Sequence, residues 1–137
     1  MPVKIKRAYD EPSAGDGTRI LVDGLWPRGM TKAELKISKW EKAIAPSQPL
    51  RTWYGHDPEK WLEFRKRYRE ELAQSPRKEA LEQLIRLAGQ GSLTLVFGAR
   101  DAERSNAAVI AELIGARLEG GQEQPPGPGR RGRRPRL

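Results

Sequence analysis

One short apolar run constrains the fold of this 137-residue chain more than any other feature of its sequence. From Leu93 to Phe97 the side chains are apolar except for one threonine, a composition typical of a strand that is buried on both faces. Two further strands are predicted at 3–7, where apolar residues alternate with lysines, and at 19–23, where an apolar run ends in a carboxylate. A strand buried on both faces belongs to a sheet that is covered on both sides, so the rest of the chain must supply those covers.

Helical patterns lie between and after these strands. Helices are predicted at about 32–36, at about 38–44, from Asp57, from Ser75 and over about 102–117. The first two are kept separate because Thr31 and Glu34 have capping-box spacing, which recurs from Ser38. Helices between apolar strands predict an α/β fold, which we expect to be a small three-layer domain with a mostly parallel three-stranded sheet and flanking helices. The connector 8–18 is short for a helical crossover, so the first two strands are joined either by a loop crossover, which we expect, or by a hairpin.

The positive charge of the chain is concentrated at its C-terminal end. The formal net charge is +8, and residues 119–137 carry five arginines among prolines and glycines, against two glutamates. A segment of this composition cannot bury a core. We therefore expect a folded domain at 1–118 followed by a disordered basic tail at 119–137.

Composition also bears on the compartment. The chain contains no cysteine, which fits a reducing environment, and no apolar run approaches the ~20 residues that span a bilayer. Its first residues lack the apolar core of a signal peptide. We expect a cytoplasmic protein without membrane association, and no pattern in the sequence indicates an oligomeric state.

The groups that follow the predicted strands indicate one candidate site. If the strands are parallel, their carboxyl ends share one edge of the sheet, where ligands bind in open α/β folds. That edge collects Tyr9, Asp10, residues 23–29, Arg100 and Asp101. Arg28 could hold a phosphate or carboxylate through two parallel hydrogen bonds, and Arg100 could reinforce it. The alternative is that Arg28 pairs with Asp23 or Asp10 and only locks the loop.

The remaining candidates each have a functional and a structural interpretation. His56 is the single histidine, so it could act as a general acid or base or could only hydrogen-bond a turn. Trp26 and Tyr54 could stack on a planar ligand or belong to the core, and Asp101 could contact a ligand or cap the last helix. The predicted ligand-binding residues are Arg28, Arg100, Trp26, Gly29, Tyr54 and Asp101, and the catalytic candidates are His56, Asp23 and Asp10. Two carboxylates without supporting histidines do not indicate a metal site, and no cofactor is indicated.

Four blocks of the sequence occur together in one known family. They are Ile5 to Arg7, Leu21 to Asp23 with Leu25 to Gly29, Trp53 to Pro58, and Leu93 to Val96 leading to Ala99 to Asp101. With these blocks the chain resembles, over about residues 3–115, the YeaO-like family of small bacterial proteins (domain of unknown function 488). The resemblance implies no particular reaction, because the family has none established. The sequence also lacks a Walker loop, a nucleophile-elbow serine motif and zinc-ligand spacing.

The chain departs from the family pattern at two positions near the candidate site. The resemblance places an arginine where this chain has Gly24, and a histidine where it has Arg104. If either missing residue is catalytic in relatives, this chain binds a ligand without turning it over. Arg104 could partly replace the missing positive charge.

Two functions remain in competition at this point. The first is binding of an anionic small molecule at the sheet edge, with or without catalysis. The alternative is a nucleic-acid-binding or regulatory module that uses the basic surface and the arginine-rich tail, whose binding would weaken steeply with salt. Against the alternative, the domain shows neither a helix-turn-helix signature nor an aromatic strand motif for RNA.

Overall fold

The structure, a computed structural model, describes residues 3–120 and is organised around a parallel sheet. Its four strands are β1 (Val3–Arg7), β2 (Thr18–Leu21), β3 (Lys39–Trp40) and β4 (Leu93–Phe97). The strand order is β1-β4-β2-β3, and every pair of neighbours is parallel. The α/β class is therefore confirmed, whereas the prediction of three strands was one short.

The first two strands are joined by a loop crossover, as expected, and not by a hairpin. β1 and β2 both pair with β4, so they flank it and do not pair with each other. The connector between them holds only a short 3-10 turn at Ala14–Asp16. A loop is enough here because the chain moves only across one intervening strand.

The missed strand lies within a predicted helix. Lys39 and Trp40 extend the sheet beside β2, and only Lys42–Ile44 forms a helical turn, of 3-10 type. Trp40 is held by tertiary contacts, because its indole Nε1 donates to the carbonyl oxygen of Asp23 at 2.7 Å. The prediction of a helix at 38–44 was wrong because these contacts outweigh the local capping signal at Ser38.

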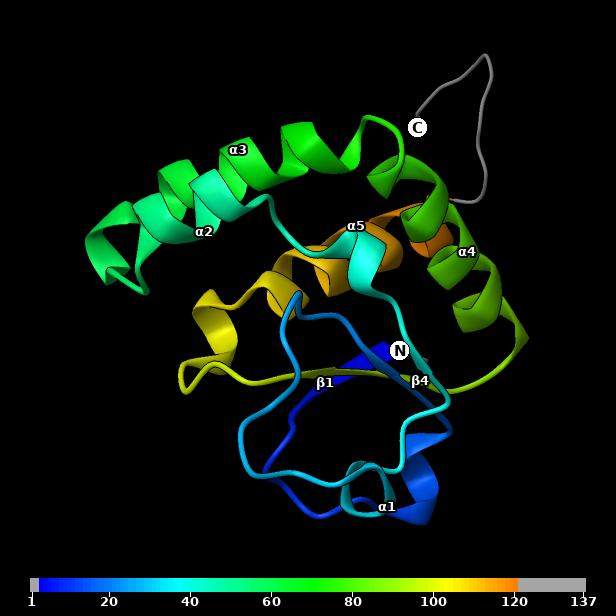
Figure 1. Cartoon of the computed structure of the whole chain (residues 1–137). Coiled ribbons are helices and arrows are strands. Elements are labelled where there is room, and N and C mark those ends of the chain that lie inside the picture. Colours follow the sequence, from blue (N-terminus) through cyan, green and yellow to red (C-terminus); the bar gives the residue numbers. More distant parts are fainter. Residues whose placement is uncertain (1–2, 121–137) are drawn as a thin grey trace.

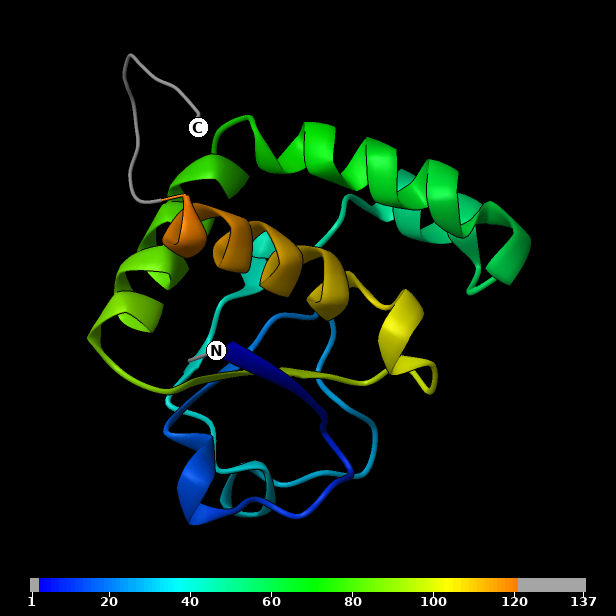
Figure 2. The ribbon, with the colours of Figure 1, turned by 180° about the vertical axis from the view of Figure 1, so that it is seen from behind.

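Five helices cover the sheet unequally. They are α1 (Lys32–Leu35), α2 (Gln48–Tyr54), α3 (Trp61–Leu72), α4 (Arg77–Gln90) and α5 (Asn106–Glu119). The helices α3, α4 and α5 lie on one side of the sheet, and α1 lies on the other side (Figure 1; Figure 2). Alternate residues of a strand face opposite sides, so Ile20 and Leu95 pack toward the large helices while Leu21 and Val96 pack toward α1.

The helix α2 was not expected, although the sequence carries its start signal. The hydroxyl of Ser47 accepts from the amide of Leu50, and Pro49 stands in the first turn, where its missing N–H is not needed. The helix ends at Gly55, which has a left-handed φ of 53°. The helix is hard to predict because two prolines, Pro46 and Pro49, precede most of it, and proline is disfavoured inside a helix.

A buried charge cluster holds the crossover loop against the sheet. The carboxylate of Asp16 is fully buried and lies 2.7 Å from Nη1 of Arg19 and 3.1 Å from Nζ of both Lys4 and Lys6. Burial alone would raise the pKa of Asp16, but hydrogen bonds from Ser13, Lys4 and Lys6 hold that pKa well below its usual range. The loop is thus tied to both β1 and β2 by one side chain.

Two further expectations concern the tail and membrane association. The proposed tail at 119–137 lies outside the described residues, apart from Glu119 and Gly120 at the end of α5. Within residues 3–120, every helix is too short or too polar to cross a membrane.

Neutralising Asp16 will destabilise the fold. Asp16→Asn leaves the buried Arg19 without its counter-ion, so we expect the free energy of unfolding at neutral pH to fall by about 3 kcal/mol. Urea denaturation followed by tryptophan fluorescence measures this. Glu11→Gln, at an exposed carboxylate, serves as the control and should change stability by less than about 0.5 kcal/mol.

The same carboxylate predicts an acid dependence with a definite sign. Because the pKa of Asp16 is lowered by folding, its contribution is complete above the ordinary value of 3.8 and is lost as the pH falls below that value. The wild type should therefore lose stability in acid more steeply than Asp16→Asn. Equal slopes for the two proteins would contradict the assignment.

Candidate functional site

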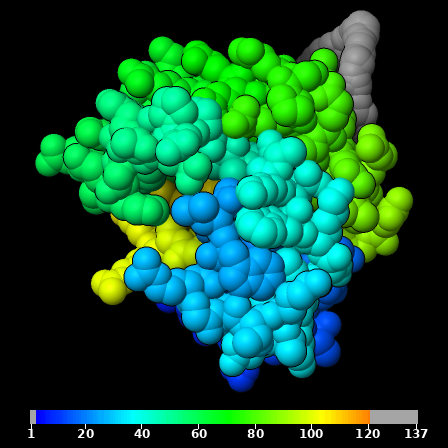
Figure 3. Space-filling model, viewed as in Figure 1, coloured from blue at the N-terminus to red at the C-terminus, as the bar shows by residue number. Residues whose placement is uncertain are grey.

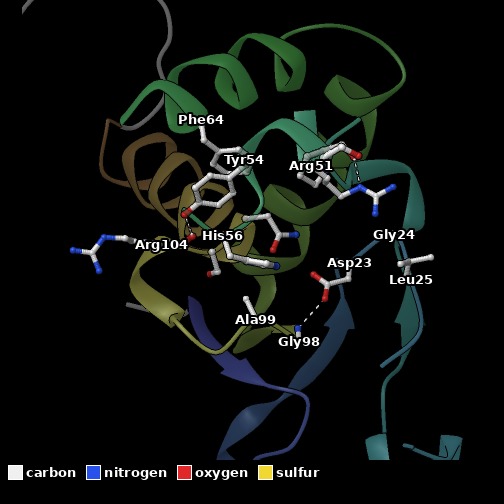
Figure 4. Close-up of a pocket in the computed structure, with 14 residues that line it drawn as sticks. Asp23, Gly24, Leu25, Arg51, Tyr54, His56, Phe64, Gly98, Ala99 and Arg104 are labelled. Carbon is white, nitrogen blue, oxygen red and sulfur yellow. Dashed lines mark hydrogen bonds between the residues drawn. The ribbon is translucent and has the colours of Figure 1, made fainter. Parts of the chain in front are cut away.

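A pocket lies where the carboxyl ends of β2 and β4 meet the helices. Its volume is about 430 Å³, and it is lined by residues that follow β2, residues of α2 and the turn after it, and residues that follow β4. Figure 3 shows these three segments meeting on one face of the molecule, and Figure 4 shows the side chains that they contribute. This position agrees with the general rule that open parallel sheets bind ligands beyond the carboxyl ends of their strands.

Among residues 3–120, Asp23 is the only carboxylate that lines the pocket. Its Oδ2 accepts a hydrogen bond from the amide of Gly98 at 2.8 Å, which joins the ends of β2 and β4. A Cβ on residue 98 would stand 3.2 Å from that same oxygen, so glycine allows the close approach. Burial raises the pKa of Asp23, although the Gly98 amide, Asn106 and the charges of His56 and Arg51 oppose the rise.

Arg51 brings a half-buried guanidinium into the same pocket from α2. Its Nε donates to the carbonyl oxygen of Pro46 at 3.3 Å. Its Cζ lies 3.6 Å from the point where a Cβ on Gly24 would stand, so the guanidinium packs against a residue without a side chain. Within residues 3–120, Arg51 forms no salt bridge.

The turn after α2 places two aromatic rings at the pocket. Gly55 and His56 have consecutive left-handed φ values of 53° and 59°, a conformation that is uncommon for a residue with a side chain and that often marks functional sites. Tyr54 is buried, its ring stacks on Phe64 with centroids 4.2 Å apart, and its hydroxyl donates to the carbonyl oxygen of Arg104 at 2.8 Å. Burial, with the negative charge of Asp101, raises the pKa of that hydroxyl, which favours its protonated, donating form.

The start of α5 forms another wall. The Ser105 hydroxyl caps the helix by accepting from the amide of Ala108, and it also donates to the carbonyl oxygen of Ala102 at 2.7 Å. Asn106 donates from Nδ2 to the carbonyl oxygen of Val22 at 3.1 Å, which fixes the end of β2. Arg104 lines the pocket while its Nη1 pairs with Asp101 at 2.8 Å.

The structure brings together some of the residues predicted from the sequence. Asp23, Tyr54 and His56 line the pocket, and in the view of Figure 4 Asp23 lies between His56 and Arg51. The other predicted site residues, Asp10, Trp26, Arg28, Gly29, Arg100 and Asp101, do not line it. Their roles in ligand binding remain predictions.

Contacts on the other side of the sheet explain where several of these residues lie. Trp26 packs edge-on against Trp40 with ring centroids 5.5 Å apart, and its Nε1 donates to the carbonyl oxygen of Met30. Arg28 is exposed and forms a salt bridge with neither Asp23 nor Asp10, although its carbonyl oxygen accepts from Tyr9. The loop after Asp23 thus leaves the pocket and covers the opposite face.

Sequence reasoning missed Arg51 altogether. The signal for Arg51 was the Ser47 cap with Pro49, which starts α2 and sets the direction of its side chains. Among residues 3–120 there is no group of three or more histidine, cysteine, aspartate or glutamate side chains that could hold a metal ion.

Comparisons with known proteins place the chain among relatives of similar length. A family model described as the inactive DUF488-N3 subclade matches residues 2–129. The uncharacterised protein Rv3073c of Mycobacterium tuberculosis is 43% identical over 115 residues, which cover 84% of this chain and 95% of that protein. The uncharacterised protein YeaO of Escherichia coli is 38% identical over 114 residues, which cover 83% of this chain and 97% of that protein. No solved structure matches the chain with significance.

The raised pKa of Asp23 predicts that this residue costs stability. A carboxylate whose pKa is raised by folding destabilises the protein at neutral pH, where it is charged. Asp23→Asn keeps an oxygen for the Gly98 amide, so we expect the free energy of unfolding to rise by about 1 kcal/mol. The gain should shrink as the pH is lowered through the pKa of Asp23, because the wild-type side chain then becomes neutral too.

Chemical denaturation at neutral pH and in mild acid measures this difference. Asp10→Asn, which changes an exposed carboxylate outside the pocket, is the matched control and should stay within about 0.5 kcal/mol of the wild type. A loss of stability in Asp23→Asn would instead assign Asp23 a structural role.

Proposed function

The chain belongs to the DUF488 family, in the subclade described as inactive, and on this premise we propose that its pocket binds a small anionic molecule without transforming it. The proposal rests above all on Arg51. A half-buried guanidinium that lines a pocket and has no salt-bridge partner within residues 3–120 is a ready site for a carboxylate or phosphate.

The surroundings of Arg51 support an anion. Among the residues 3–120 that line the pocket, Asp23 is the single carboxylate, whereas Arg51 and His56 both bring basic side chains. Arg104 also lines the pocket, but its guanidinium pairs with Asp101. The amino-terminal end of the 14-residue helix α5 lies at the same wall and adds a positive potential. The volume of about 430 Å³ is in the range typical of small-molecule sites.

Binding without turnover fits the way two of the pocket hydroxyls are used. The hydroxyl of Tyr54 donates to a backbone carbonyl, and that of Ser105 both caps α5 and donates to another carbonyl. A hydroxyl that is held in this way has no base poised to activate it. This fits the description of the matched subclade as inactive.

The alternative function, nucleic-acid binding, gains little from the described residues. Most arginines on the outer helices are paired with acidic partners, as in Arg65 with Glu112, Arg67 with Glu63 and Arg117 with Glu82. Paired arginines offer less free charge to a phosphate backbone. The alternative therefore depends on the arginine-rich segment after Gly120, which lies outside the described residues.

A thermal-shift series tests the anion site. The full-length protein is heated with inorganic phosphate, sugar phosphates and mono- and dicarboxylates, and a ligand that binds the folded state raises the melting temperature as its concentration passes Kd. We expect at least one anion to raise the melting temperature. We expect Arg51→Gln to weaken the binding of that anion by about tenfold or more.

Arg28→Ala is the matched control, because it removes an exposed arginine that does not line the pocket. It should bind like the wild type. Binding that survives Arg51→Gln but is lost in Arg28→Ala would move the site to the loop at 23–29, and the absence of any anion-dependent shift would refute the proposal.

A further inference from the structure

The pocket holds two opposite charges that do not pair with each other. Asp23 and Arg51 both line it, yet neither forms a salt bridge with the other or with any other residue in the range 3–120. They are nevertheless close enough for the charge of Arg51 to act on the carboxyl group of Asp23. In the view of Figure 4 both side chains border the same open space.

Each of these groups has unused hydrogen-bonding capacity. A carboxylate can accept about four hydrogen bonds, whereas within residues 3–120 Asp23 has the amide of Gly98 as its backbone donor and Asn106 as a neighbouring side-chain donor. A guanidinium has about five N–H donors, and the bond formed by Arg51 uses only its Nε. Charges that are partly removed from water without a partner cost free energy, so an arrangement of this kind favours a ligand that supplies both partners.

The pocket also has an apolar wall. The rings of Tyr54 and Phe64 stack on each other and line the cavity together with Leu25. Phe64 is almost fully buried, whereas Leu25 is 69% exposed and stands at the rim. The cavity is therefore large enough, and apolar enough on one side, for a hydrophobic group attached to the two charged ends.

We propose that the ligand is a zwitterion of the amino-acid type, with its ammonium group on Asp23, its carboxylate on Arg51 and an apolar side group against Tyr54 and Phe64. This inference rests on the proposed function and identifies the anionic group held by Arg51 as the carboxylate of a zwitterion. A ligand with only negative groups would bring like charge next to Asp23, and a ligand with only an amine would leave Arg51 without a partner. Both mismatches cost free energy in a pocket that is partly shielded from water.

Three matched probes separate these cases. Isothermal titration calorimetry of the full-length protein compares L-phenylalanine, which carries both charges, with 3-phenylpropionate, which lacks the amine, and phenethylamine, which lacks the carboxylate. We expect L-phenylalanine to bind about tenfold more tightly than either of the other two, because each loses one charged hydrogen-bonding partner.

Substitutions assign each end of the ligand to its residue. In Asp23→Asn the preference for L-phenylalanine over 3-phenylpropionate should disappear, because the repulsion of a bare carboxylate is removed together with the ammonium partner. In Arg51→Gln the preference for L-phenylalanine over phenethylamine should disappear instead. Glu11→Gln and Arg86→Ala, which change exposed groups outside the pocket, should keep both preferences.

The possible failures can be told apart. Binding of 3-phenylpropionate at least as tight as that of L-phenylalanine, and dependent on Arg51, overturns the zwitterion and leaves the anion site standing. The same holds if phosphate or another anion binds through Arg51 while all three phenyl probes fail. If no probe and no anion binds in an Arg51-dependent way, both the inference and the proposed function are overturned.

Discussion

The pairing of β4 with a strand on each side is the constraint on which the rest of the structure depends. All five residues of β4 are buried, and their register with β1 and β2 makes the three strands parallel and aligned. Leu21 lies opposite Val96, and the same register carried two residues further brings Asp23 opposite Gly98. The hydrogen bond from the Gly98 amide to the Asp23 carboxylate therefore continues the pairing of β2 with β4 into the pocket.

The same sheet separates Arg28 from the pocket, although the sequence alone would place it at the same edge as Asp23. Leu21 and Val96 face the side covered by α1, and the segment after Asp23 follows them to that side, where Trp26 packs on Trp40. On the other side, α2 packs against the core formed by the large helices and lies near the carboxyl ends of the strands. For this reason Arg51 lines the pocket and Arg28 does not.

The predictable parts of this protein are those that depend on local patterns. Strands at 3–7 and 93–97 have the predicted bounds because their side chains already show how each face is buried. The strand Lys39–Trp40 was missed because two residues carry no periodicity and are held by contacts with β2 and Asp23. Asp23 could be expected at the sheet edge because it follows a strand. The Ser47 cap and Pro49 indicate the start of α2, but the packing that brings Arg51 of this helix to the pocket depends on tertiary contacts.

The polar groups of the pocket divide into two kinds, and the division bears on what the site does. The hydroxyls of Tyr54 and Ser105 are bonded to the backbone and stabilise the walls. The charges of Asp23 and Arg51 are left without salt bridges to residues 3–120, although pairing them would relieve the cost of their burial. Selection for stability alone would pair or remove such charges, as it has paired Asp16 with Arg19 in the same domain. We propose that these charges are matched by the complementary charges of the bound zwitterion, since residues 3–120 supply no ion-pair partner for either.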